Sequence, residues 1–418
     1  MNVSKVTGKL KEQIHLFSGK LSTDLPRVAS RFLEEAIFGI QARQSLRLSE
    51  WGRALHEEIP LIKTITRLSR QLNRVGLWWR ITSRVLQLAR GKIGKSTLLV
   101  VDISDISKAY AKKMEYLGGV YDGSKGVISD GYFTIHVIAC EAGESEVLPL
   151  YSRLYSSLAP DFEGENLEII KAVQRVSSGV GDNGTWVIDR GGDRGQLYEH
   201  FLSHNRRFLI RLKGDRHLLY RGRKVLAREL ADRCPLPYRE VLIREESRTE
   251  KRFDLDFGFL PVQLPKMAMR LSLVVVTGFG PEPMMLLTNL PMRRNRAALY
   301  QVVESYLSRW RIEETIRFIK QSYRLEDVRV LTYTRLQNMM ALVLAVAYFT
   351  MVYLARRVKL KAVSRLLLKA SRRIFGIPDF RYYALSDGIR ELLQRHDKGP
   401  LRFLRHKPTQ IQFSLFNP

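Results

Sequence analysis

Two apolar runs that each end on an aspartate constrain the fold of this chain more than any other feature. The first reads Ser-Thr-Leu-Leu-Val-Val-Asp from Ser96 to Asp102, and the second reads Thr-Trp-Val-Ile-Asp from Thr185 to Asp189. Continuous apolar runs of this length are typical of strands that are buried on both faces of a sheet. A carboxylate there is costly to desolvate unless it is paired or binds a metal, although a strand-end aspartate is also common as a helix cap or turn residue.

The segment around these runs alternates strands with helices. Residues 131–140 and 146–150 are expected to form a hairpin, with Gly143 in the turn between them. An amphipathic helix is expected at 166–176, before the second aspartate, and a helix at 193–202 and a strand at 208–212 after it. The order of three strands, helix, strand, helix and strand indicates the α/β class.

The remaining parts of the chain differ from this core in composition. Residues 1–95 carry apolar residues at spacings of three and four with Arg and Lys between them, which predicts helices. We expect a DNA-binding domain there, with a plain helical bundle as the alternative. Strand-like pieces in 214–283, separated by charged and Pro-rich turns, predict a β-rich insertion into a core of 96–213 and 284–355. Residues 356–418 form a basic C-terminal segment.

The charge of the chain points to a polyanionic partner. The 69 Lys and Arg residues exceed the 42 Asp and Glu residues by enough to give a net charge of +27. Nucleic acid is the first candidate, and an anionic membrane surface is the alternative. Two distant cysteines, Cys140 and Cys234, do not make a disulfide framework and favour a reducing compartment such as the cytoplasm. The apolar stretch 339–355 is at the short limit for a membrane span and is expected to be a buried core helix.

Four polar or charged side chains near the end of the core are spaced so that they would share one face of an α-helix. Tyr306, Arg309, Glu313 and Lys320 fall within an arc of roughly 60° when an α-helix is assumed. Arg317 falls near the same stripe, although a solvated face explains it equally well. A carboxylate beside cations on one helix face indicates a metal ligand next to groups that hold phosphates.

Other acids compete with these candidates. Asp105 is a rival to Asp102 but is expected to fall beyond the strand, without an apolar run behind it. Asp193 is a rival to Asp189 and is expected instead to cap the helix that follows it. Glu314 points about 100° away from its neighbour in the stripe. The set that remains consists of two strand aspartates and one helix glutamate, and such oxygen-only sets hold Mg²⁺ or Mn²⁺.

With these motifs in place, the chain resembles bacterial insertion-sequence transposases of the DDE type, in the subgroup that carries a Tyr-Arg-Glu-Lys signature. The four residues of the stripe match the signature spacing without a gap. Asp102 in Val-Val-Asp-Ile-Ser-Asp and Asp189 in Asp-Arg-Gly match the two aspartate motifs. The resemblance covers about residues 96–350 and implies a ribonuclease-H-like core of mixed strands that carries the β-rich insertion.

The resemblance also implies an activity. The protein would cleave DNA at transposon ends and join those ends to target DNA by phosphoryl transfer, acting as a homodimer on the terminal inverted repeats. Two divalent ions, Mg²⁺ or Mn²⁺, would be held by Asp102, Asp189 and Glu313. DNA would be contacted by Tyr306, Arg309, Lys320 and Arg317. A catalytically inactive DNA-binding descendant, or a nuclease of the same fold without strand transfer, are the alternatives.

Overall fold

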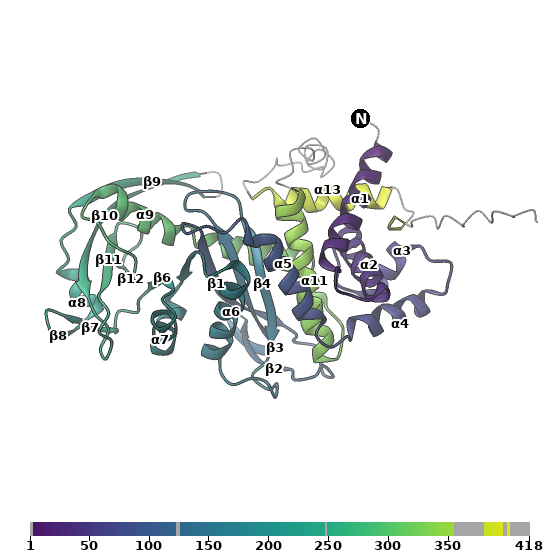
Figure 1. Cartoon of the computed structure of the whole chain (residues 1–418), viewed down its shortest axis with the longest axis horizontal. Helices are drawn as coiled ribbons and strands as arrows, with labels where there is room; N and C mark the ends of the chain where they lie inside the picture. The colour runs from purple at the N-terminus through teal and green to yellow at the C-terminus, as the bar shows by residue number, and fades with distance from the viewer. Residues whose placement is uncertain (1–2, 123–125, 247–248, 355–379, 396–398, 402–418) are drawn as a thin grey trace, which may run out of the picture.

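The computed structural model describes residues 3–122, 126–246, 249–354, 380–395 and 399–401. Figure 1 shows a sheet in the centre, a set of strands at one end and the N-terminal helices at the other. The main sheet has ten strands, and a separate pair of strands lies beside it. The α/β class expected from the sequence is confirmed.

The centre of the sheet has the expected ribonuclease-H-like strand order, β4-β3-β1-β5-β6. Strand β3 runs antiparallel to both of its neighbours, β1 and β4, while β1, β5 and β6 run parallel to one another. A short strand, β2 (Gly118–Asp122), pairs with the start of β3. The bounds of the five central strands are β1 Leu98–Ser107, β3 Val127–Cys140, β4 Leu148–Tyr155, β5 Thr185–Ile188 and β6 Arg207–Arg211.

Strand β1 is longer than the sequence indicates. It continues past Asp102 because β3 is long enough to pair with it as far as Ser107, which lies opposite Gly131. Asp105 therefore lies within the strand, and the expectation that it falls beyond the strand is wrong. The additional residues put polar side chains on a strand whose first part, Leu98–Val101, is buried.

The insertion extends the central sheet. Strand β12 returns to pair antiparallel with β6, and the order then continues through β11 and β10 to β9. A small two-stranded sheet and one short helix lie beside these strands. The bounds are β7 His217–Tyr220, β8 Arg223–Leu226, α8 Ala227–Asp232, β9 Tyr238–Glu246, β10 Thr249–Val262, β11 Leu271–Thr277 and β12 Met284–Thr288.

Helices cover the sheet and build the other end of the molecule. In the core these are α6 Glu165–Val180, the short η1 Arg190–Gly192, α7 Gly195–Ser203, α9 Arg296–Leu307, α10 Trp310–Ser322 and η2 Leu325–Asp327. At the far end they are α1 Val3–Leu21, α2 Arg27–Arg43, α3 Leu48–Leu55, α4 Leu61–Leu72, α5 Leu77–Arg90 and α13 Tyr382–Arg395. Of the basic C-terminal segment, residues 356–379, 396–398 and 402–418 lie outside the described residues.

The apolar helix α11 (Tyr333–Tyr348) joins the two ends, and a π-helical stretch, Phe349–Leu354, follows it. It lies between β4 on one side and α2, α4 and α5 on the other (Figure 1). The segment Tyr333–Leu354 is the one described helix long and apolar enough to cross a membrane, and 94% of its most apolar window is buried. Packing inside the protein accounts for its composition, as expected for a core helix.

One buried amide ties α11 to the N-terminal helices. The Asn338 side chain donates to the carbonyl oxygens of Leu72 and Arg74 and accepts from the backbone N–H of Trp78. These groups lie in the connection between α4 and α5, where helix ends leave backbone groups without intrahelical partners. A side chain of α11 therefore completes the hydrogen bonding of a loop more than 250 residues earlier in the chain.

Candidate active site

Asp102 and Asp189 occupy equivalent positions on neighbouring parallel strands. The register pairs Leu98 with Thr185 and Val100 with Val187, so each aspartate follows the last pair by two residues. Neighbouring strands lie roughly 4.8 Å apart, and residues in register point to the same face. The two carboxylates are thus brought together by strand register although 87 residues separate them (189 − 102 = 87).

A cation continues this row on the third parallel strand. Ile188 pairs with Ile210, so Arg211 takes the position next to Asp189. The sequence analysis did not identify Arg211 as a site residue. The available signal was a charged residue at the end of a third apolar strand, and it has meaning only once the three strands are known to be adjacent.

The charged groups of the candidate site influence one another electrostatically. Burial, followed by the nearby Asp189 carboxylate, raises the pKa of Asp102 from 3.8 to about 7. The Arg309 guanidinium works against this rise, and Glu313 adds a smaller increase. Asp102 also accepts a hydrogen bond of 2.9 Å from the backbone N–H of Ile103. It therefore lies within electrostatic range of all three groups.

Asp189 also forms a local cap. Its Oδ1 accepts a hydrogen bond of 2.8 Å from the Gly191 N–H and begins the short helix η1. A Cβ added at Gly191 would lie 2.9 Å from that oxygen, so the close approach favours glycine there. The cap uses only one of the two carboxylate oxygens of Asp189, so the other oxygen remains available to the candidate site.

Asp193 has a different role from the one expected. It does not cap α7, whose N-cap position is Arg194. Instead it is buried, and it accepts hydrogen bonds from the Tyr198 hydroxyl, the Lys213 N–H and Arg216 Nε at 2.7–3.0 Å. The expectation of a helix cap is wrong because Lys213 and Arg216 lie at least 20 residues away in sequence, beyond the range of a local pattern.

The four signature residues lie on two consecutive helices. Tyr306 ends up on α9, and Arg309 occupies the N-cap position of α10, which carries Glu313 and Lys320. Between them the backbone bonds tighten, because Arg309 N–H and Ile312 N–H each bond a carbonyl three residues earlier. The single helical stripe expected from the sequence is therefore interrupted at Ser308.

Ser308 lies at the interruption and bonds to two different segments. Its Oγ donates to the carbonyl of Glu304 at 2.8 Å, a bond that competes with regular helical geometry. The same oxygen accepts from the Gly143 N–H at 3.1 Å and so fixes the junction to the β3–β4 turn. The break between the two helices is thus anchored to the core sheet.

Arg309 holds the Glu313 carboxylate in this structure. Their ion pair is 2.5 Å long between the guanidinium and Glu313 Oε1, and the side chains are 18% and 49% exposed. The Nε of Arg309 is buried and has no hydrogen-bond partner among the described residues. Arg309 therefore keeps donor capacity for a further acceptor at the site.

The buried ring of Tyr306 lies next to the Arg309 guanidinium. It is only 5% exposed, and the Arg309 guanidinium carbon lies 6.0 Å from its ring centroid. Burial raises the pKa of Tyr306, while Arg309 and Arg211 oppose that rise. A ring this buried cannot stack on a base unless the surrounding side chains move.

Cations from α10 line an open cleft beside β1. The cleft has a volume of about 1030 Å³ and is bordered by Asp102, Glu313, Arg317 and Lys320. Lys320 Nζ lies 3.4 Å from Asp105 Oδ1, and Arg317 pairs with Glu314. The structure thus places the two cations at the cleft, and each of them is bonded to a carboxylate outside the candidate metal set.

The candidate metal ligands are of the chemical type that binds divalent cations, but their side chains are not arranged to hold one in this structure. Within the described part of the chain, no group of three or more His, Cys, Asp or Glu side chains lies close enough to hold a metal ion. Glu313, one of the three candidate ligands, is bonded to Arg309 instead. The donors are all carboxylate oxygens, the ligand type that Mg²⁺ and Mn²⁺ prefer, and the Asp189 carboxylate is the second cause, after burial, of the raised pKa of Asp102.

Comparison with known proteins gives one family. Residues 165–349 match the family described as "Transposase DDE domain". The matched segment contains Asp189 and Glu313, and it begins after Asp102. No curated protein sequence matches the chain. Among solved structures, the chain is similar to the piggyBac transposase synaptic complex with hairpin DNA, at a TM-score of 0.44 and 10% identity, over 94% of this chain and 80% of that chain.

Proposed function

Because this chain is a DDE-type transposase by its domain over residues 165–349, we propose that it cleaves DNA at transposon ends and joins them to target DNA. The observation that carries the proposal is the register that aligns Asp102 with Asp189 on adjacent parallel strands. Asp102 then lies in the electrostatic range of Glu313 from α10. Ligands commonly bind at the carboxyl ends of strands in open α/β sheets.

Asp102, Asp189 and Glu313 would hold two divalent ions, Mg²⁺ or Mn²⁺. When bound, the ions supply the activation of water or a 3′-hydroxyl and the stabilisation of the leaving oxygen in an in-line displacement at phosphorus. Asp102 must lose its proton to serve as a ligand. Glu313 must leave Arg309, and it has room to turn because its side chain is half exposed.

Release of Glu313 gives Arg309 its function toward DNA. Its guanidinium is then free on two sides, because its Nε already has no partner among the described residues. A guanidinium in this position binds phosphate through a fork of donors. Lys320 and Arg317 would add phosphate contacts along the same cleft, and Tyr306 would position Arg309 from its buried site.

The net charge of +27 supports DNA as the partner. We place terminal inverted repeats on the N-terminal helices of residues 1–95, where Lys63 and Arg70 of α4 are exposed. The reacting phosphates would enter the cleft of the core, 96–213 with 284–355. Two copies of the chain would hold paired ends as a homodimer.

The test uses three isosteric variants and two substrates. Asp102→Asn, Asp189→Asn and Glu313→Gln should each lose Mg²⁺-dependent nicking of transposon-end DNA by a factor on the order of 10³ or more. Their affinity for the same DNA in EDTA should stay within a few-fold of the parent chain. Intact nicking in all three variants would contradict the site assignment.

A strand-transfer assay with precut ends separates the alternatives. Transfer of those ends into a target plasmid supports a transposase. Nicking without transfer identifies a nuclease of the same fold. DNA binding without any cleavage, in the parent chain with Mg²⁺ or Mn²⁺, identifies a binding protein that has lost catalysis.

A further inference from the structure

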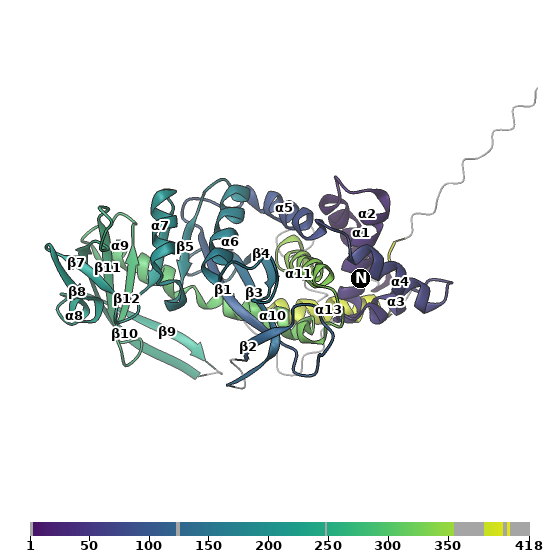
Figure 2. The ribbon, with the colours of Figure 1, turned by 90° about the horizontal axis from the view of Figure 1, so that it is seen from below.

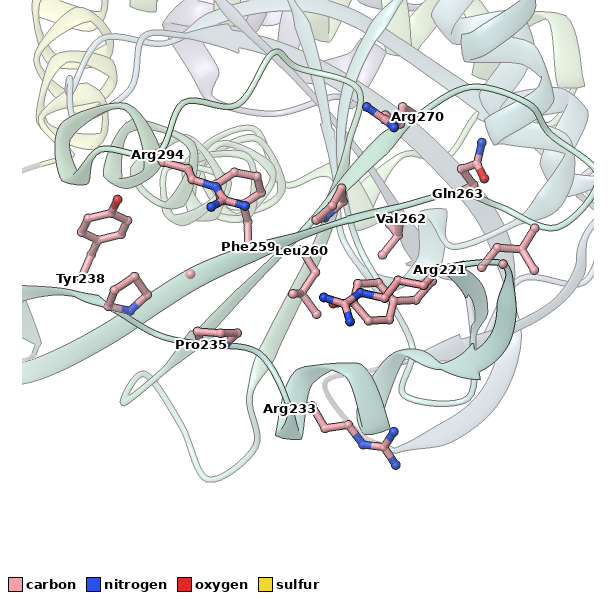
Figure 3. Close-up of a pocket in the computed structure, with 16 residues that line it drawn as sticks. Arg221, Arg233, Pro235, Tyr238, Phe259, Leu260, Val262, Gln263, Arg270 and Arg294 are labelled. Carbon is pink, nitrogen blue, oxygen red and sulfur yellow. The ribbon is translucent and has the colours of Figure 1, made fainter.

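A concave pocket in the insertion has no role in the site described above. Figure 3 shows that arginines from separate segments surround it, together with Tyr238 and Phe259. Its volume is about 700 Å³, and it shares no lining residue with the cleft beside α10. The pocket is therefore a separate feature, built from strands that the ribonuclease-H-like centre does not use.

The charge of this pocket is uncompensated. Four exposed arginines line it, and none of the described lining residues is acidic; they are Arg221, Arg233, Arg270 and Arg294. None of the four forms an ion pair with a described residue, whereas neighbouring arginines do, such as Arg228 with Glu282. Four arginines around one pocket without a described counter-charge favour an anionic occupant.

The walls and floor of the pocket are aromatic and rigid. Tyr220, Tyr238 and Phe259 are each partly exposed in the lining, and the Arg221 guanidinium carbon lies 5.2 Å from the Tyr220 ring centroid. At the floor, a Cβ added at Gly258 would lie 1.9 Å from the Pro235 carbonyl oxygen, so strand β10 and the segment before β9 are in direct backbone contact. The pocket is therefore held open by the sheet.

We propose that this arginine pocket binds the phosphodiester backbone of DNA, at a site outside the catalytic cleft. Arginine forks suit phosphate oxygens, and partly exposed rings beside them offer a stacking surface to any unpaired base. The proposal rests on the proposed function only in taking DNA as the polyanion. An exposed patch of four unpaired arginines does not require metal or cleavage for binding.

The experiment measures the salt dependence of DNA binding in EDTA by fluorescence anisotropy. The double variant Arg221→Gln/Arg294→Gln should lower the slope of log Kd against log salt by about 1 per arginine removed. The matched control is Arg228→Gln, which removes an exposed arginine already paired with Glu282 and should leave the slope unchanged. Thermal unfolding of each variant shows that the fold is kept.

Single-stranded and duplex probes of one sequence distinguish the source of the phosphates. A larger effect on the single strand assigns the pocket to an unpaired stretch, and an equal effect assigns it to duplex backbone. An unchanged slope for both probes, or an equal change in the Arg228 control, overturns the proposal. If the proposed function fails instead, the parent chain shows no cleavage, but the slope of log Kd against log salt still changes in the double variant.

A second inference comes from a buried lysine at the end of β1. Lys108 Nζ donates to the carbonyl oxygen of Val328 at 2.6 Å and also to that of Glu326. Its side chain is buried, and its backbone N–H is bonded to Asp130 at 2.6 Å. Lys108 thus joins the strand that carries Asp102 to the turn that directly follows α10.

A second lysine, Lys320, also connects β1 to the region of α10. Lys320 on α10 is paired with Asp105 on β1, so two lysines connect the same strand to the same helix region. We infer that Lys108 is a positioning residue that sets the separation of Asp102 and Glu313 and thereby the affinity of the acidic site for divalent ions. Residues that orient metal ligands typically change affinity by about 10–100-fold when they are lost.

The test measures Mn²⁺ binding without DNA, by electron paramagnetic resonance. Lys108→Met keeps the length of the side chain and removes its donors, so Mn²⁺ affinity should fall on the order of tenfold. Lys108→Arg keeps donors to the carbonyls and should restore most of it, and the exposed Lys112→Met is the control. Unchanged Mn²⁺ affinity in a folded Lys108→Met protein overturns the inference, whereas absent binding in the parent chain counts against the proposed function instead.

Discussion

At the scale of the single residue, the most informative group is Asp102, because its surroundings disfavour its charge. The folded protein holds this proton up to about pH 7, while an unfolded chain loses it near 3.8. The folded state therefore binds more protons between these values, and the metal-free protein loses stability as pH rises through this range. Above about 7 the effect is constant.

This gives a prediction for metal-free protein in EDTA. Asp102→Asn removes the charge, so its melting temperature relative to the parent chain should rise as pH is raised from about 4 to about 7. Differential scanning calorimetry across that range measures the difference. A constant difference between variant and parent would show that the Asp102 carboxyl titrates as it does in the unfolded chain.

Asp193 allows a second prediction at this scale. Its carboxylate is 1% exposed and accepts three hydrogen bonds, so Asp193→Ala should cost about 3 kcal/mol of unfolding free energy. Asp254→Ala, which removes an exposed partner of the exposed Arg252, should cost less than about 1 kcal/mol. Urea unfolding measures both. Cleavage per folded molecule should stay unchanged in Asp193→Ala, in contrast to Asp189→Asn.

These residues also show what the sequence could predict about the site. Asp102, Asp189 and Glu313 were recognisable because each stands in a motif whose spacing is local. Arg211 was not, since its position beside Asp189 depends on which strands are adjacent. The hydrogen bonds of Asp193 were hidden for the same reason, because its partners belong to a loop that the chain reaches after α7 and β6.

At the scale of helices and strands, the register between β1 and β3 determines where Asp102 lies. Gly131 permits that register, because a Cβ there would lie 2.3 Å from the Ile106 carbonyl oxygen. Gly131→Ala should therefore destabilise the protein by about 2 kcal/mol and reduce cleavage per folded molecule. Gly119→Ala in the adjacent strand is the control, since its Cβ would meet only ordinary contacts. Equal stabilities of the two variants would contradict this account.

The strands and helices themselves were predictable to different degrees. Continuous apolar runs located the central strands, because these strands are buried on both faces, and apolar residues at helical spacing located α6. The sequence pattern did not predict the junction at Ser308, where a side-chain hydroxyl bonds both its own helix and Gly143. It also ended β1 too early, since the length of a strand depends on the length of its partner.

At the scale of the whole molecule, one sheet contains both the strands of residues 214–283 and the strands β1 and β5 of the candidate site. Strand β12 bonds directly to β6, so the arginine pocket and the acidic cleft are parts of one continuous sheet. Figure 2 shows β9 and β2 projecting toward the same side of the molecule. A polyanion bound across that side could contact both ends of the sheet at once.

The same scale gives a prediction about truncation. Helices α2, α4 and α5 pack on α11, and Asn338 completes the backbone bonds of the α4–α5 connection. A fragment of residues 96–354 would expose the apolar face of α11 and leave Asn338 without these partners. It should aggregate or melt well below the full chain in a thermal shift assay. A soluble fragment with an unchanged melting temperature would show that the N-terminal helices are dispensable for the core.

The late position of α11 in the chain also affects how the protein folds during synthesis on the ribosome. The helix is central in space but begins at Tyr333, late in translation. Until it emerges, the N-terminal helices and β4 lack the apolar surface on which they pack. Glu313 is made only shortly before it. A nascent chain therefore cannot bring Asp102, Asp189 and Glu313 together on a packed core until α11 has been synthesised.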